Sequence, residues 1–137
     1  QWDAFLLAGR YTLLEQESLH TLFPAVEKHG ASIVIGGPFN SGILVGGSTF
    51  NYGKAPEAVV TKVKKMAEIC ARHRVPLAAA ALQFPLANKL VASVIPGPRS
   101  AVELNQIFAW RETKIPAALW SDLKSEGVLD KAAPVPT

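Results

Sequence analysis

Residues 31–38, Ala-Ser-Ile-Val-Ile-Gly-Gly-Pro, form the stretch that decides the fold. Its β-branched centre favours an extended strand, and two glycines and a proline then end that strand in a loop. Apolar residues on both faces of so short a run are typical of a strand buried in a parallel sheet. Residues 4–8 and 91–95 have the same character. The sequence therefore predicts three buried strands.

Helical patterns separate these strands. The spacing of apolar residues and the positions of Pro and Gly predict helices over 18–29, from Pro56 to about Arg72, over 77–82, from Ser100 onward and over 116–126. Strands that alternate with helices indicate an α/β fold with parallel strands joined by right-handed crossovers. The pattern fits either a doubly wound sheet or part of a (β/α)₈ barrel.

Three finer expectations concern caps and burial. Ser18 and Ser100 are expected to be N-caps, and Glu103 completes a capping-box pattern with Ser100. On the helix after Pro56, helical spacing predicts an inner face made of Val59, Val63, Met66 and Cys70. The charged residues expected to face away are Lys62, Lys65, Glu68 and Arg72. Residues 132–137 are expected to form an exposed tail.

Composition restricts the class of protein. The chain has 137 residues, 49% of them hydrophobic and 18% charged, which is typical of about one domain with its own core. Its apolar runs are shorter than the roughly 18 residues that a membrane span needs. The net charge is only +3, and no basic run exceeds Lys64-Lys65, so neither a membrane nor a nucleic acid is an expected partner.

Cysteine use and the first residues suggest the cellular setting. The chain has one cysteine, Cys70, which cannot form an internal disulfide, and no secretory signal pattern precedes the first strand. A reducing, cytoplasmic location is therefore expected. The chain begins at Gln1 and enters its first strand pattern at once, so we expect it to be a fragment.

Ligand chemistry is expected beyond the carboxyl ends of the strands, where parallel α/β folds hold their ligands. The loops there are 9–12, 36–42 and 97–100. The third is the most informative, because Arg99 precedes a helix whose N-terminal N–H groups attract anions, phosphate above all. A simpler interpretation is that Ser100 and Glu103 only cap the helix and Arg99 is solvated; the residues leave both open.

Other reactive residue types carry no chemical prediction. The three histidines, His20, His29 and His73, have no second ligand at metal spacing, so surface or capping roles are favoured and no metal is predicted. Cys70 falls on the apolar face of its helix, where a core role is favoured over a nucleophile. Tyr11 is interpreted as a packed turn residue.

Three motifs in order carry a resemblance: Tyr11-Thr12-Leu13-Leu14-Glu15, Gly37-Pro38-Phe39-Asn40-Ser41-Gly42-Ile43-Leu44 and Val94-Ile95-Pro96-Gly97-Pro98-Arg99-Ser100. They resemble the last three strand-end motifs of the aldo-keto reductases, in the branch of sugar and pyridoxal dehydrogenases that includes L-fucose and D-threo-aldose 1-dehydrogenases. The resemblance implies that residues 1–137 are the C-terminal, cofactor-binding portion of a (β/α)₈ TIM barrel, about its last three βα units.

The same resemblance implies an NAD(P)-dependent oxidoreductase that moves hydride between nicotinamide and a small carbonyl or sugar substrate. By analogy, one group of residues lies along the diphosphate and ribose: Gly37, Phe39, Ser41 and Leu44. A second group holds the adenosine end: Gly97, Arg99 and Glu103. The family's catalytic Tyr, Lys, Asp and His belong to the N-terminal half of the barrel, so no catalytic residue is assigned here. That missing half is an expected partner, and this portion alone is expected to be inactive.

Departures from the family pattern leave alternatives open. Ala8 replaces a common Gln and Gly36 a common Tyr near the nicotinamide, while Gln106-Ile107 replaces a Glu-Asn pair near the adenine. The choice between NAD and NADP is therefore not fixed. A non-catalytic nucleotide-binding module related to the family, and a small free-standing α/β anion-binding domain, are the two alternative functions.

Overall fold

The computed structural model describes residues 2–137. Three parallel strands, β1 (Ala4–Ala8), β2 (Ser32–Gly36) and β5 (Val91–Ile95), form one sheet in the order β1-β2-β5, which confirms the predicted strands. Ala8 pairs with Gly36, and Gly36 pairs with Ile95. The carboxyl ends of the three strands therefore lie side by side.

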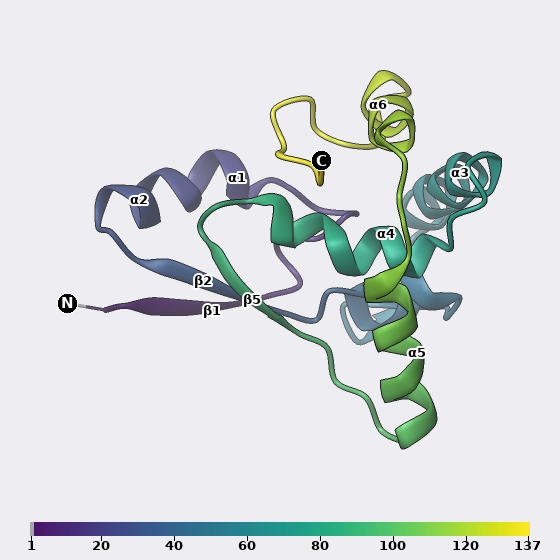
Figure 1. The fold of residues 1–137 in the computed structure, drawn as a ribbon, viewed down its shortest axis with the longest axis horizontal. Helices are drawn as coiled ribbons and strands as arrows, with labels where there is room; N and C mark the ends of the chain where they lie inside the picture. Colours follow the sequence, from purple (N-terminus) through teal and green to yellow (C-terminus); the bar gives the residue numbers. More distant parts are fainter. Residues whose placement is uncertain (1) are drawn as a thin grey trace.

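Helices follow the strands in the predicted order (Figure 1). The α-helices are α1 (Ser18–Thr21), α2 (Phe23–Lys28), α3 (Glu57–Arg72), α4 (Leu77–Gln83), α5 (Ala101–Glu112) and α6 (Ala117–Ser125). Two 3₁₀ segments, η1 (Asn40–Val45) and η2 (Phe84–Ala87), and a small hairpin, β3 (Thr49–Phe50) with β4 (Gly53–Lys54), complete the described chain. In Figure 1, α1, α2 and α4 lie on one side of the sheet.

The core lies between the sheet and these helices. Ile33 and Ile35 of β2 are fully buried there. Three aromatic residues extend the same core: the ring centroids of Tyr11 and Phe84 are 5.2 Å apart, and those of Phe84 and Trp120 are 6.4 Å apart. Trp120 belongs to α6, so these contacts connect the last helix to the loop after β1.

The opposite face of the sheet is open in the described chain. Leu6 of β1 is 66% exposed and Ile95 of β5 is 49% exposed. Within residues 2–137, β1 and β5 each pair only with β2, so both outer strands have an unpaired edge. An uncovered apolar face with two unpaired edges is what a portion of a closed barrel would show.

The predicted helix over 18–29 is broken into α1 and α2 at Leu22. Pro24 is the second residue of α2, where its missing N–H costs no helical hydrogen bond. The expected N-cap role of Ser18 was wrong. Ser18 is the first residue of α1, and its hydroxyl donates to the Arg10 carbonyl oxygen at 2.6 Å, which fastens the helix to the loop after β1.

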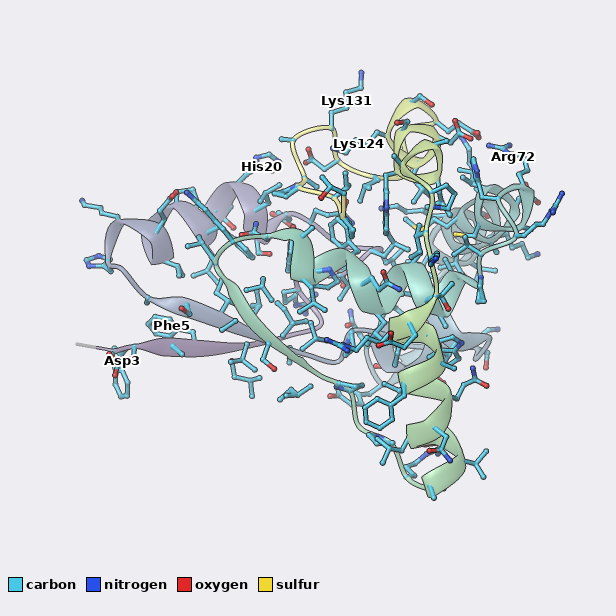
Figure 2. The ribbon with its side chains drawn as sticks, in the orientation of Figure 1. Asp3, Phe5, His20, Arg72, Lys124 and Lys131 are labelled. Atoms are coloured by element: carbon cyan, nitrogen blue, oxygen red, sulfur yellow. The ribbon has the colours of Figure 1, made fainter. Side chains whose placement is uncertain are left out.

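Helix α3 has the predicted inner face: Met66 and Cys70 are buried, and Val59 and Val63 are partly buried and pack against the core. Burial raises the pKa of the Cys70 thiol to about 11, as befits a core residue. The prediction that Lys62 faces away was wrong: its ammonium donates to the Leu14 carbonyl oxygen at 2.7 Å, and burial lowers its pKa. Arg72 does lie outside the core, next to α6, where it pairs with Glu126 (Figure 2).

The C-terminal segment is not uniformly exposed, contrary to prediction. Ala133 is 1% exposed, and Val135 packs against the core. Just before this segment, Asp130 Oδ2 lies within hydrogen-bond distance, 2.5 Å, of Nε2 of His20, the α1 residue labelled in Figure 2. This contact holds the pKa of Asp130 below its ordinary value. Across residues 2–137, no helix is both long and apolar enough to cross a membrane.

Candidate functional site

The loop after β2 has an unusual backbone. Gly37, Asn40, Ser41 and Gly42 all have positive φ, between 48° and 100°. Such angles strain side-chain-bearing residues such as Ser41, so the surrounding structure must hold them in place. Part of that support is local: the Tyr52 backbone N–H, from the β3–β4 turn, donates to Ser41 Oγ at 3.1 Å.

Buried side chains also hold the loop after β2 against the loop after β1 and the hydrophobic core. Asn40 is 3% exposed, and its side-chain amide donates to Glu15 Oε2 at 2.9 Å, which ties the loop after β2 to the loop after β1. Ile43 and Leu44 are buried in the hydrophobic core. Leu44, which the resemblance implied along the cofactor, therefore serves the loop as a core anchor, and it does not border the cavity described below.

The N-terminus of α5 confirms the predicted cap at Ser100. Ser100 Oγ accepts a hydrogen bond from the Glu103 backbone N–H at 3.1 Å. The Glu103 carboxylate reaches one residue beyond the usual capping box, because it accepts from the Arg99 backbone N–H at 2.7 Å and from Arg99 Nη2 at 2.9 Å. These bonds from Arg99 lower the pKa of Glu103, and the Glu103 carboxylate raises the pKa of Arg99.

These two segments, far apart in sequence, enclose one cavity of about 580 Å³. Six of the seven residues predicted for cofactor binding line it: Gly37, Phe39, Ser41, Gly97, Arg99 and Glu103. The other lining residues are Pro38, Gly42, Val45, Pro98, Gln106, Ile107 and Trp110. The cavity lies beyond the carboxyl ends of β2 and β5, the place where parallel α/β folds bind ligands.

One wall of the cavity is aromatic. The rings of Phe39 and Trp110 meet edge to face, with centroids 5.6 Å apart and an interplanar angle of 74°. Trp110 was not predicted to belong to the site. The sequence does contain a pattern that could have identified Trp110. Glu103, Gln106 and Trp110 are three and four residues apart, so they share one face of α5.

The loop after β1 does not line this cavity, although its position at the strand ends made it a candidate. Tyr11 and Thr12 are fully buried, and Thr12 Oγ1 accepts the Leu14 and Glu15 backbone N–H groups at 3.2 and 3.1 Å. The loop is therefore a structural turn. Tyr11 packs as predicted, and burial raises the pKa of its hydroxyl.

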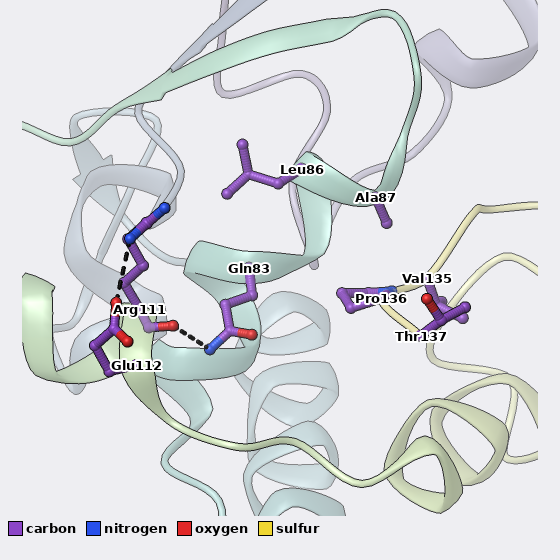
Figure 3. Close-up of a pocket in the computed structure, with 8 residues that line it drawn as sticks. All are labelled: Gln83, Leu86, Ala87, Arg111, Glu112, Val135, Pro136 and Thr137. Carbon is purple, nitrogen blue, oxygen red and sulfur yellow. Dashed lines mark hydrogen bonds and ion pairs between the residues drawn. The ribbon is translucent and has the colours of Figure 1, made fainter.

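A second, larger cavity of about 620 Å³ lies between η2, the end of α5 and the C-terminal segment (Figure 3). The side chains of Gln83, Arg111 and Glu112 in its lining are already engaged. The Gln83 amide donates to the carbonyl oxygens of Trp110, Arg111 and Thr113, and Arg111 pairs with Glu112 at 3.2 Å. We therefore place the candidate site in the first cavity, where loop backbone and a charged pair converge.

In the described part of the chain, no group of three or more His, Cys, Asp or Glu is arranged to hold a metal ion. Two of the histidines pair with carboxylates instead, as in the contact of 2.7 Å between His73 Nε2 and Asp122 Oδ2. These contacts join α3 to α6 and α1 to the C-terminal segment.

Solved structures with the same arrangement define the class of fold. An aldo-keto reductase from Bacillus halodurans matches in its holo form with a TM-score of 0.67 and 23% identity, over 96% of this chain and 44% of that chain. Its apo form matches with a TM-score of 0.64 and 24% identity, over 93% and 44%. The α/β fold is therefore that of part of a (β/α)₈ barrel, as the resemblance implied.

Comparison with known sequences identifies the protein family. The model of the aldo/keto reductase family matches residues 2–126, so the chain belongs to the aldo/keto reductase family. It is 43% identical over 131 residues to pyridoxal 4-dehydrogenase from Microbacterium luteolum, covering 93% of this chain. It is 39% identical over 126 residues to D-threo-aldose 1-dehydrogenase from a Pseudomonas species, covering 88% of this chain. Both relatives belong to the branch that the motifs indicated. The chain spans 38% of the length of each of these two relatives.

Proposed function

We propose that the first cavity binds a nicotinamide dinucleotide, and that the chain is the cofactor-binding portion of an oxidoreductase that moves hydride between nicotinamide and a carbonyl or aldose substrate. The observation that carries the proposal is the convergence of Gly37, Phe39 and Ser41 with Gly97, Arg99 and Glu103 on one cavity. These residues reach the cavity from two separate strand ends.

The donor set fits such a ligand. Glycines allow the backbone to approach a diphosphate closely, and the left-handed turn from Asn40 to Gly42 curves the chain around the cavity. Phe39 and Trp110 offer an apolar wall to a planar ring. At the N-terminus of α5, the Arg99 and Glu103 side chains line the cavity, and they offer N–H donors and carboxylate acceptors to phosphate oxygens and ribose hydroxyls. By the family resemblance, this end takes the adenosine.

The nicotinamide end would meet small residues. Ala8 and Gly36 are paired across β1 and β2, and a Cβ built on Gly36 would lie 3.6 Å from that of Ala8. When bound, the nicotinamide ring accepts or gives the hydride. The described residues then bind and orient the dinucleotide, and the proton-transferring residues belong to the remainder of the barrel. On this proposal the described portion alone is inactive.

The buried Cys70 thiol agrees with a reducing, cytoplasmic location.

Nucleotide binding to the full-length protein tests the proposal. Isothermal titration with NAD and NADP should give a one-site isotherm with at least one of them. Gly97→Leu should weaken that binding about tenfold or more, because a Cβ at Gly97 meets no atom within 4 Å and the new side chain would enter the cavity without backbone strain. Ala132→Leu, at an exposed position away from the cavity, is the matched control.

Turnover separates the enzyme from the non-catalytic module. Absorbance at the reduced nicotinamide band should rise when the full-length protein is given oxidised cofactor with L-fucose, other aldoses or pyridoxal. Binding without turnover on any of these substrates would favour the non-catalytic alternative. If neither nucleotide binds, the proposed function is wrong.

A further inference from the structure

Glu15 belongs to the loop after β1, which does not line the first cavity. Its side chain is 27% exposed and has two neighbours: Oε2 accepts from the Asn40 side-chain amide at 2.9 Å, and Oε1 lies 3.5 Å from Arg10 Nη1. Asn40 stands between Phe39 and Ser41 in the chain, and both of these residues line the cavity. The Glu15 carboxylate therefore contacts the loop that forms one cavity wall without reaching the cavity.

The Glu15 carboxylate is the closer of the two acceptors of the Asn40 amide. The other acceptor, the Gly9 carbonyl oxygen, is 3.4 Å away, which is beyond the ordinary range for an N–H···O hydrogen bond. Asn40 also has a φ of 48°, in the left-handed region that residues with a side chain rarely adopt. Without Glu15, a buried amide would lose its main partner at a strained position, and the loop would shift to satisfy it.

The far end of the same segment is held at the same turn. The chain from Asn40 to Lys62 carries η1, the β3–β4 hairpin and the first residues of α3. Lys62 Nζ donates to the Leu14 carbonyl oxygen at 2.7 Å. Burial lowers the pKa of Lys62, and the charge of the Glu15 carboxylate opposes that change. Both ends of this segment are therefore fixed to the dipeptide Leu14-Glu15.

We propose that Glu15 is a positioning residue for the dinucleotide: acting through Asn40, it holds Phe39 and Ser41 where they line the cavity. The proposal rests on the proposed function. Phe39 also meets Trp110 edge to face, with ring centroids 5.6 Å apart, so holding Phe39 keeps the aromatic wall in place. Because Glu15 does not line the cavity, its effect on a ligand passes through the Asn40 amide.

Dinucleotide binding to the full-length protein measures this role. Glu15→Ala removes the acceptor of the Asn40 amide, and it should weaken binding of whichever of NAD and NADP binds more tightly by about tenfold in isothermal titration. Glu15→Gln keeps an oxygen that can accept from Asn40, so its binding constant should stay within about threefold of the unaltered protein. Glu17→Ala makes the same truncation at an exposed position two residues along and should leave the binding constant unchanged.

A double variant assigns the effect to the Glu15–Asn40 contact. Glu15→Ala and Asn40→Ala break the same hydrogen bond, so the two together should weaken binding no more than the more damaging of them alone. If the two effects multiply, Glu15 does not act through Asn40 and the inference is wrong. In a turnover assay, Glu15→Ala should raise the KM for the dinucleotide about tenfold and change kcat less than about threefold, since the lost contact serves binding.

A measurement on the free protein checks the same contact without a nucleotide. The Trp110 indole ¹⁵N–¹H signal, assigned by its loss in Trp110→Phe, senses the adjacent Phe39 ring. It should shift in Glu15→Ala and stay in place in Glu15→Gln and Glu17→Ala. The indole signal of Trp120, which is buried in the core, should stay in place in all three variants.

These readouts separate positioning from a purely structural role. A Glu15→Ala variant that unfolds more readily but keeps both the dinucleotide affinity and the Trp110 signal of the unaltered protein would overturn the inference. Failure of the unaltered protein to bind either nucleotide would overturn the proposed function, and the Trp110 signal would still decide whether Glu15 holds Phe39 in place.

Discussion

The two segments that enclose the cavity are held in place by different forces. The loop after β2 is fixed from within, because Asn40 and Leu44 are almost fully buried beneath it. The turn before α5 is fixed at the surface, by the Ser100 cap and the exposed Arg99–Glu103 pair. Packing therefore shapes one side of the site, and capping and charge shape the other.

This difference has a consequence for how the site responds to change. A packed loop loses its shape only when buried volume or a buried hydrogen bond is removed, and such losses are large. A surface pair contributes little to folding stability and is screened by salt. We expect changes to the loop after β2 to affect folding and binding together, and changes at the turn before α5 to have smaller effects on folding stability.

The largest effect is expected from Leu44→Ala. Leu44 is 1% exposed, so truncation leaves a cavity in the core and should cost about 2–5 kcal/mol of unfolding free energy in a urea titration. The neighbouring Val45 is 42% exposed, and Val45→Ala should cost under about 1 kcal/mol. Equal costs for the two variants would show that the loop is not anchored by packing.

Asn40→Ala separates the buried hydrogen bond from the backbone conformation. Asn40 and Asn51 have nearly equal φ, 48° and 49°, but Asn51 is exposed while the Asn40 amide donates to Glu15. We expect Asn40→Ala to destabilise the protein by about 1–3 kcal/mol more than Asn51→Ala, measured by chemical denaturation. If the two variants lose the same stability, backbone strain alone explains the loop.

Ser100→Ala removes the cap on the surface side of the site. Loss of a serine N-cap should cost about 0.5–2 kcal/mol, less than Leu44→Ala, measured in the same denaturation assay. Ser121→Ala is the control, because that exposed hydroxyl only bonds to the Ala117 carbonyl within α6. A Ser100→Ala variant as stable as the control would mean that the Arg99–Glu103 pair alone holds this turn.

The smallest effect concerns acid titration of the surface pair. Hydrogen bonds from Arg99 lower the pKa of Glu103 below its ordinary value of 4.5. For a carboxyl with a lowered folded-state pKa, the stabilising contact is present above the unfolded value and is lost as pH falls through the folded one. The ¹⁵N–¹H chemical shift of Arg99 should therefore follow a titration whose midpoint lies below pH 4.5. This titration should disappear in Glu103→Gln. Titration at or above 4.5 would show that the pair is open in solution.

Local pattern predicted much of the fold. The strands at 4–8 and 91–95, the cap at Ser100 and the inner face of α3 followed from periodicity, Gly and Pro positions and cap chemistry, all of which act between near neighbours. Errors arose where a distant partner decided the outcome. Lys62, for example, turns toward a carbonyl oxygen in the loop after β1.

The order of three strand-end motifs was enough, in the sequence alone, to indicate the family and to single out six of the thirteen residues that line the cavity. Their role in cofactor binding stays a prediction. Tertiary structure decided which side of each loop faces that cavity. It turned Leu44 into the core, added Trp110 to the wall and closed Glu103 onto Arg99. The physical reason is that burial and pairing depend on which segments pack together, and short-range pattern carries no record of partners far away along the chain.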